Sequence, residues 1–252
     1  MRIDDGSVRR ITFDRPDVYN AMTAAVARDL ADALSDLNPD DHDAVVITGD
    51  GDAFSAGGDI EAMAERDESA PEAYERVRTT LGRVAEAVLT APVPVVAKVN
   101  GDAVGAGMAL AAASDFAYAA DSARFGASFI NVGLVPDLGG TAILPRLIGL
   151  RKTKELAFTG TLIPAAEAAD LEIVNETVPD DQLDERVDDL LETLADQPTE
   201  SIGLAKRAIH KNLGASLQDG LEREAHFQTL AYDTEAHAEG VDAFLNDRTP
   251  EF

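Results

Sequence analysis

Two glycine-rich turns contain the first residues in the chain whose spacing could do chemistry. One spans Phe54 to Ile60 and the other Asn100 to Gly107, and each follows a predicted strand and opens a predicted helix. Small residues let a ligand approach the main chain, and free N–H groups at a helix start point outward with the positive end of the helix dipole. Two such donors that converge on one oxygen form an oxyanion hole. For either turn taken alone, glycine that only permits a tight bend is the favoured explanation.

The third candidate is Asp137, a carboxylate held in apolar sequence between a proline and two glycines. Desolvation at such a position would raise its pKa and make it a general base. The alternative is an N-cap for the helix predicted to begin near Thr141, and the residues alone do not separate the two. Other loop acids have structural explanations: Asp59 is expected to start a helix, and Asp102 to lie at a pocket rim.

The elements that must position these residues alternate between strand and helix in the first part of the chain. Apolar spacing predicts a hairpin of two strands up to Phe13, strands at 44–48, 93–99 and 116–119, and helices at 20–37, 61–63, 71–89 and 108–113. This alternation favours β-α-β units with parallel pairing. From Gly140 onward the sequence is helical, at 142–148, 152–158, 165–169, 183–194, 201–211, 217–232 and 235–245, with one strand at 173–178.

Composition excludes several classes of protein. The 252 residues are 45% hydrophobic, enough for a real core, and no apolar run approaches the roughly 18 residues that a membrane span needs. The N-terminal residues lack the apolar stretch of a signal peptide, so we expect a soluble, cytoplasmic protein. The absence of cysteine excludes disulfides, thiol nucleophiles and thiolate metal sites, and the four histidines lack metal-binding spacing, so no metal site is expected.

The strong negative charge is the second feature of the composition. Against 47 acidic residues there are 21 basic ones, giving a net charge of −26, which argues against nucleic-acid and anionic-membrane partners. Basic side chains are mostly arginine, since lysine occurs only at Lys98, Lys152, Lys154, Lys206 and Lys211. Molar salt shortens the Debye length to about 3 Å and removes the self-repulsion of such a surface. The composition therefore favours a halophilic origin over an acidic protein of ordinary salinity.

Taken together, the motifs resemble the crotonase superfamily of enoyl-CoA hydratases and isomerases over nearly the whole chain. The resemblance rests on the two loops, on Asp115 in its apolar context, and on the segments Phe125-Gly126, Gly133–Pro136, Gly139–Thr141 and Gly240–Leu245. It implies an α/β fold, a ClpP/crotonase-like spiral of β-β-α units over residues 1–195, with a C-terminal helical trimerisation region over 196–252. It also implies acyl-CoA thioester substrates, a homotrimer or dimer of trimers, and no cofactor beyond the CoA of the substrate.

The resemblance also assigns roles to individual residues. The amides of Gly58 and Ala106 become the oxyanion-hole donors; many relatives have glycine at the second position, but the donor is a main-chain N–H. The substrate-binding residues become Val18, Ala56, Gly57, Gly58, Ile60, Gly105 and Phe129, of which Val18, Ala56 and Ile60 fall where the family contacts CoA or its pantetheine arm. Asp17 replaces a basic residue that many members place near the CoA phosphates. The cations expected near the CoA entrance are Arg15, Arg248, Arg151, Lys152 and Lys154.

Two departures from the family pattern indicate the type of reaction. Hydratases of this family carry a glutamate at each of two positions that here read Ala109 and Phe129. Neither residue can activate water or carry a proton, so hydration is disfavoured. Asp137 remains, at a position where several family isomerases carry an acid, and the surrounding sequence resembles 1,2-epoxyphenylacetyl-CoA isomerases. Phe129 would line a dry pocket for an unsaturated or aromatic acyl group, although core packing explains it equally well.

The sequence thus predicts an acyl-CoA isomerase in which Asp137 shuttles a proton and the Gly58 and Ala106 amides stabilise an enolate. Hydration, thioester hydrolysis, dehalogenation and decarboxylation stay open, because the same oxyanion hole serves all of them. Some crotonase relatives bind RNA, but the absence of a basic run argues against that function here.

Overall fold

The computed structural model describes residues 1–252 and is built on two sheets. In the larger sheet, β1 (Arg2–Asp4) pairs antiparallel with β2 (Val8–Phe13), as the predicted hairpin requires. The strands that follow β2 are all parallel: β3 (Ala44–Gly49), β5 (Val95–Val99), β7 (Phe116–Ala120) and β10 (Glu176–Val178). The smaller sheet contains β4 (Ala53–Ser55), β6 (Asp102–Val104) and β8 (Arg124–Gly126) in parallel, with β9 (Ile163–Pro164) antiparallel at its edge.

A repeated unit connects the two sheets. Each of β3, β5 and β7 continues into a short strand of the smaller sheet, β4, β6 and β8 respectively. Helix α2 (Ile60–Ala64) follows the first pair, α5 (Ala106–Ala113) the second, and the 3-10 helix η2 (Ser128–Val132) the third. The architecture is therefore the expected spiral of β-β-α units. We did not predict the four short strands, because segments of two or three residues are too short to show an apolar period.

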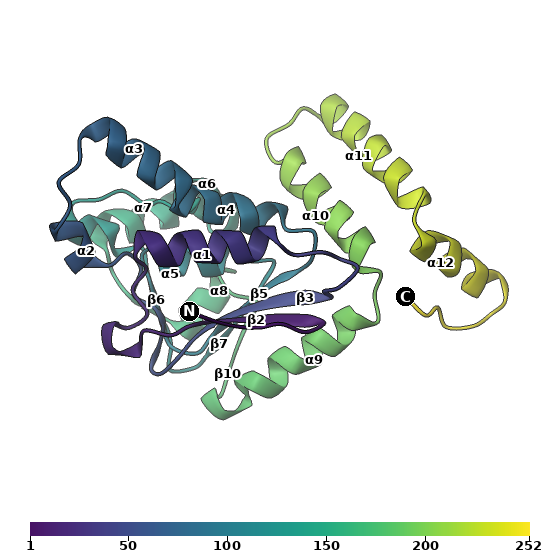
Figure 1. Ribbon diagram of the computed structural model, residues 1–252, viewed down its shortest axis with the longest axis horizontal. Coiled ribbons are helices and arrows are strands. Elements are labelled where there is room, and N and C mark those ends of the chain that lie inside the picture. The colour runs from purple at the N-terminus through teal and green to yellow at the C-terminus, as the bar shows by residue number, and fades with distance from the viewer.

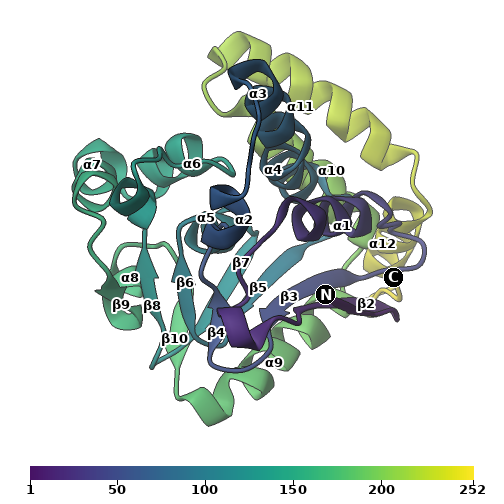
Figure 2. The same cartoon turned by 60° about the vertical axis from the view of Figure 1, so that its left-hand side comes forward.

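Helices cover both faces of the larger sheet (Figure 2). On one face, the main core joins the sheet to α1 (Ala24–Ser35), α4 (Leu81–Thr90) and α5. On the other face, a smaller cluster joins β3, β5, β7 and β10 to α9 (Leu183–Ala195). All eight residues of α5 are buried, which explains why this helix has no polar face.

The remaining helices are α6 (Gly140–Leu147), α7 (Gly149–Thr159), α8 (Ala165–Asp170), α10 (Thr199–Asn212), α11 (Leu217–Tyr232) and α12 (Glu235–Leu245). The last three stand to one side of the layered core (Figure 1). Helix α10 packs against α4, and α11 packs against α10. None of the helices in the structure combines the length and the apolar character needed to cross a membrane.

Three predicted elements differ from the structure. The helix predicted over 20–37 begins only at Ala24, because Met22 forms a β-bridge with Gly58 and Thr23 caps the helix. The helix predicted over 71–89 is broken at Thr80 into α3 (Ala70–Thr79) and α4, because Thr80 adopts φ −116° and ψ −94° and its hydroxyl donates to the carbonyl of Arg76. The strand predicted over 173–178 is confined to β10. Ile173 and Val174 are buried in the preceding turn, and their burial accounts for the apolar pattern.

Candidate active site

The loop between β4 and α2 leaves one amide free. The neighbouring amides donate inside the protein, from Ala56 to the carbonyl of Tyr19, from Gly57 to Ser55 Oγ and from Asp59 to the carbonyl of Met22. Met22 also donates its own N–H to the carbonyl of Gly57 at 2.6 Å, so it bonds the loop on both sides of Gly58. The Gly58 N–H has no acceptor within the protein. It is therefore available to a ligand oxygen.

The loop between β6 and α5 presents the second amide. Gly105 adopts φ 56° and ψ −121°, and its N–H donates to the carbonyl of Gly126 at 2.8 Å. Ala106 is the first residue of α5, so its N–H has no acceptor within the helix and lies at the positive end of the helix dipole. Ala106 itself is buried, and 1% of its surface is exposed.

The two loops touch at their glycines. Gly57 has φ +86°, and a Cβ built on it would lie 2.7 Å from the carbonyl oxygen of Val104 and 3.1 Å from the amide nitrogen of Ala106. A Cβ on Gly107 would lie 2.3 Å from the carbonyl oxygen of Ser55. Only glycine allows this approach, which brings Gly57, the neighbour of Gly58, against the Ala106 amide. The structure thus joins the two glycine-rich turns that the sequence singled out.

Asp137 lies in the turn before α6 and does not cap that helix. The N-cap is Gly139, with φ 78°, and no side chain accepts a bond from the first turn of α6, so the capping alternative is wrong. Burial raises the pKa of Asp137 to about 6, partly offset by the positive charge of Arg76 on α3. Its Oδ1 atom is buried without a hydrogen-bond partner. Next to it, Leu138 is held at φ 47° with a buried side chain, a strained conformation of the kind found at functional sites.

The turn that carries Asp137 packs on the first turn of α5. A Cβ built on Gly140 would lie 3.2 Å from Pro136 Cβ and 3.6 Å from Ala109 Cβ. Ala109 follows Ala106 by one helical turn, and its N–H donates to the carbonyl of Gly105. The carboxylate therefore lies in the turn before α6, and the free amide of Ala106 lies at the start of α5, the helix that packs against α6.

The side chains around the two amides are apolar. A Cβ on Gly58 would lie 2.3 Å from Met63 Cε, and a Cβ on Gly105 would lie 3.9 Å from the ring of Phe129. Phe129 is 8% exposed and Ala109 is 2% exposed. No acid stands at either of these two positions. Of the two carboxylates near the loops, Asp59 is paired with Arg15, whereas burial raises the pKa of Asp137.

The residues expected to contact CoA lie at the surface beside the first loop. Two of these residues are exposed apolar side chains: Val18 at the end of the 3-10 helix Pro16–Val18, and Ile60 at the start of α2. Ala56, in the loop before α2, is also exposed. The bond from the Ala56 amide to the carbonyl of Tyr19 joins the segments that carry Val18 and Ala56. This surface is suited to the apolar part of a pantetheine arm.

Most of the cations expected to bind the CoA phosphates form ion pairs with carboxylates of the chain itself. Arg15 binds Asp59, Arg248 binds Glu239 and Asp242, and Lys152 binds Glu155 and Glu167. Arg151 and Lys154 form no ion pair within the chain. The role of Arg15 was missed from the sequence, because its partner Asp59 is 44 positions away.

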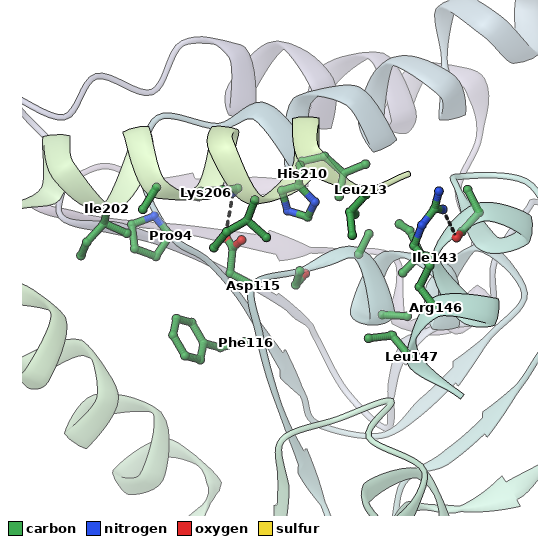
Figure 3. Close-up of a pocket in the computed structure, with 17 residues that line it drawn as sticks. Pro94, Asp115, Phe116, Ile143, Arg146, Leu147, Ile202, Lys206, His210 and Leu213 are labelled. Atoms are coloured by element: carbon green, nitrogen blue, oxygen red, sulfur yellow. Dashed lines mark hydrogen bonds and ion pairs between the residues drawn. The ribbon is translucent and has the colours of Figure 1, made fainter. Parts of the chain in front are cut away.

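A separate cavity of about 690 Å³ lies between α10, the C-terminal end of α5 and α6 (Figure 3). An ion pair between Lys206 Nζ and Asp115 Oδ2, at 2.6 Å, lies against it, with His210 nearby. None of the predicted site residues lines this cavity.

The structure contains no cluster of three or more His, Cys, Asp or Glu side chains placed to hold a metal ion.

A spiral of β-β-α units in which the loops after β4 and β6 touch at their glycines is the architecture of the crotonase fold. The model of the family described as "Enoyl-CoA hydratase/isomerase" matches residues 4–252, and the chain belongs to that family of acyl-CoA enzymes. It is 36% identical over 250 residues to a probable enoyl-CoA hydratase from Mycobacterium bovis, covering 98% of this chain and 95% of that protein. It is 34% identical over 247 residues to 1,2-epoxyphenylacetyl-CoA isomerase from Escherichia coli K12, covering 97% and 94%. The crystal structure of enoyl-CoA hydratase from Bacillus anthracis matches with a TM-score of 0.90 at 32% identity, covering 100% and 98%.

Proposed function

We propose that this enzyme isomerises acyl-CoA thioesters, with Asp137 as a single proton shuttle and the amides of Gly58 and Ala106 as the oxyanion hole. The observation that carries the proposal is the desolvated carboxylate of Asp137, whose Oδ1 atom has no hydrogen-bond partner, at a place where Ala109 and Phe129 supply no second acid. A group with a pKa near 6 is mostly ionised at neutral pH and still basic enough to accept a proton.

The proposed reaction moves a proton between two carbons of the acyl group. The Asp137 carboxylate removes a proton from the carbon next to the thioester carbonyl, and the electron pair moves onto the carbonyl oxygen. The N–H groups of Gly58 and Ala106 stabilise the resulting enolate. The protonated Asp137 then returns the proton two carbons further along, and the double bond shifts toward the thioester. The reaction consumes nothing and needs neither a metal nor a redox cofactor.

Hydration is the second candidate, because relatives bear the name hydratase more often than isomerase. Adding water requires a group that activates the water molecule and a group that delivers a proton to carbon. Asp137 could supply one of these functions. Ala109 and Phe129 have no atom that could supply the other, and Phe129 and Met63 make the surroundings dry.

A substrate panel separates the candidate reactions. We expect the purified protein in molar salt to convert a 3-enoyl-CoA or 1,2-epoxyphenylacetyl-CoA to a product of unchanged mass, measured by mass spectrometry. Rapid addition of one water to crotonyl-CoA would contradict the proposal and favour the hydratase. Release of free CoA would instead indicate thioester hydrolysis.

We also propose that the enzyme is a homotrimer, or a dimer of trimers, adapted to high salt. Helices α11 and α12 expose large apolar side chains, including Leu217, Phe244 and Leu245, which are 80%, 85% and 75% exposed. Faces of this kind are typical of surfaces covered in an assembly. The same chain carries a net charge of −26, so unscreened repulsion between copies opposes their association.

Lowering the salt concentration is therefore expected to dissociate or unfold the protein. The Debye length grows from about 3 Å at 1 M salt to about 10 Å at 0.1 M, which restores repulsion between surface carboxylates. Light scattering after gel filtration should show a trimer or hexamer in molar salt and smaller species in dilute buffer. The melting temperature should fall in parallel. A melting temperature that does not change with salt would contradict the halophilic interpretation.

A further inference from the structure

We propose that Arg15 and Asp59 are positioning residues of the oxyanion hole, whose ion pair holds the loop that carries Gly58 against the segment 20–22. The inference rests on the proposed use of the Gly58 amide in catalysis. It assigns to Arg15 a role in turnover rather than in binding the CoA phosphates.

Arg15 bonds to both of the segments that enclose Gly58. Its Nη1 donates to Asp59 Oδ2 at 2.8 Å and to the carbonyl of Ala21 at 2.6 Å. Its own backbone N–H donates to Asn20 Oδ1 at 2.9 Å, and the side-chain Nδ2 of Asn20 donates to the carbonyl of Ala53 at the start of β4. One guanidinium therefore joins the start of α2 to the segment that runs beside the loop.

Asp59 uses both carboxylate oxygens and its backbone amide. Oδ2 accepts from Arg15, and Oδ1 accepts from the N–H of Ala62 at 2.9 Å, which caps α2. Its N–H donates to the carbonyl of Met22 at 3.0 Å. These bonds hold the pKa of Asp59 below its usual value, first through the Ala62 N–H and then through Arg15.

Asp59, which makes these bonds, directly follows Gly58 in the chain. Gly58 has no side chain to anchor it, so the direction of its N–H depends on the bonds of Gly57 and Asp59 to Met22. The side chain of Asp59 is only 10% exposed, whereas that of Arg15 is 33% exposed. Removing the guanidinium leaves a buried carboxylate without its counter-charge, and the start of α2 must move to hydrate it. The Gly58 amide moves with it.

The expected effect is on kcat rather than on the binding of CoA. Displacing a catalytic group by about 1 Å can cost about 100-fold in rate. We therefore expect Arg15→Met to lower kcat about 10- to 100-fold, with the Kd for coenzyme A itself changed less than about twofold. Acetoacetyl-CoA, whose enolate places negative charge on the thioester oxygen, should bind more weakly by a factor similar to that lost in kcat.

Two further variants keep the test independent of folding. Arg15→Lys retains several N–H donors and a positive charge, and it should restore most of the lost turnover. Asp59→Asn preserves a good N-cap but removes the charge, so it should reproduce the loss seen in Arg15→Met. The double variant should be no worse than the poorer single variant, because both changes break one interaction. Arg10→Met is the matched control, since Arg10 makes a similar 2.9 Å ion pair with Asp188 between β2 and α9.

The outcomes distinguish the positioning role from its alternatives. Unchanged kcat and unchanged acetoacetyl-CoA binding in Arg15→Met and Asp59→Asn, even with a lower melting temperature, would overturn the proposal and leave a purely structural ion pair. A weaker affinity for coenzyme A at unchanged kcat would overturn it in favour of a phosphate contact. A wild-type protein without acyl-CoA turnover would refute the proposed function instead, and acetoacetyl-CoA affinity would then decide the role of Arg15.

Discussion

Asp137→Asn is expected to lower kcat for isomerisation by about 100- to 10,000-fold, the range over which a positioned general base contributes. Asparagine has almost the same shape but cannot accept the proton, and neither Ala109 nor Phe129 can replace it. The Gly58 and Ala106 amides are unaffected, so binding of an acyl-CoA should change little. Stopped assays of turnover, together with calorimetric binding of acetyl-CoA, check both parts of this prediction.

Asp137→Asn is also expected to change the stability of the protein. Burial raises the pKa of Asp137 from 3.8 to about 6, so the folded state binds its proton more tightly than the unfolded chain. The contribution of Asp137 to the free energy of unfolding is then fully present below about pH 4 and is lost as pH rises through about 6. Asp137→Asn carries no charge to desolvate, and above pH 6 it should be more stable than the wild type by up to about 3 kcal/mol.

Asp121→Asn is a suitable control, because Asp121 is exposed in the turn after β7 and should leave both rate and stability unchanged. Retention of more than a tenth of the wild-type rate by Asp137→Asn would show that Asp137 is not the base. A loss of stability at pH 8 would show that the carboxylate makes a favourable interaction in the fold.

Gly57→Ala is the second variant with a large expected effect. Its Cβ would lie 2.7 Å from the carbonyl oxygen of Val104 and 3.1 Å from the amide nitrogen of Ala106, and φ is +86°. Both neighbours are backbone atoms, so the two loops must separate. Because each loop supplies one oxyanion donor, we expect kcat to fall by about 100- to 1,000-fold, as when a donor is removed.

Gly214→Ala separates this effect from the general cost of a side chain at positive φ. Gly214 has φ +80°, and a Cβ there would meet nothing within 4 Å. Both alanine variants should lose about 1 kcal/mol of stability from backbone strain, and Gly57→Ala should lose more because its Cβ meets backbone atoms. Only Gly57→Ala should lose turnover. Equal kcat for the two variants, measured below both melting temperatures, would mean that the loops do not form the hole.

Much of this organisation could be predicted from the sequence, because it depends on local patterns. Apolar periodicity located β3, β5 and β7, and the all-apolar stretch after Gly105 indicated a buried helix. The glycines at 57, 105 and 107 marked both loops before any contact between them was visible. Asp137 stood out because it is polar in an apolar segment, and its burial raises its pKa as expected.

The rest depends on contacts between distant parts of the chain. Strands β4, β6 and β8 have three residues each, and they form only because each parent strand continues into the second sheet. The pairing of Arg15 with Asp59 and the approach of Arg76 to Asp137 follow from packing, not from spacing. From charge alone, we expected Arg15 and Arg248 near the CoA phosphates. In the fold, both side chains bind carboxylates of the chain itself.

The most direct test of the central claim is the pH dependence of kcat/KM for isomerisation of a 3-enoyl-CoA in molar salt, since this quantity reports the titration of groups in the free enzyme. For the wild type, we predict a rate that rises with pH through an apparent pKa of about 6 and then levels off, following ionisation of Asp137. Asp137→Asn should show a low rate without this rise. A wild-type profile that is flat from about pH 5 to 8, or the same rise in Asp137→Asn, would contradict the assignment of Asp137 as the proton shuttle.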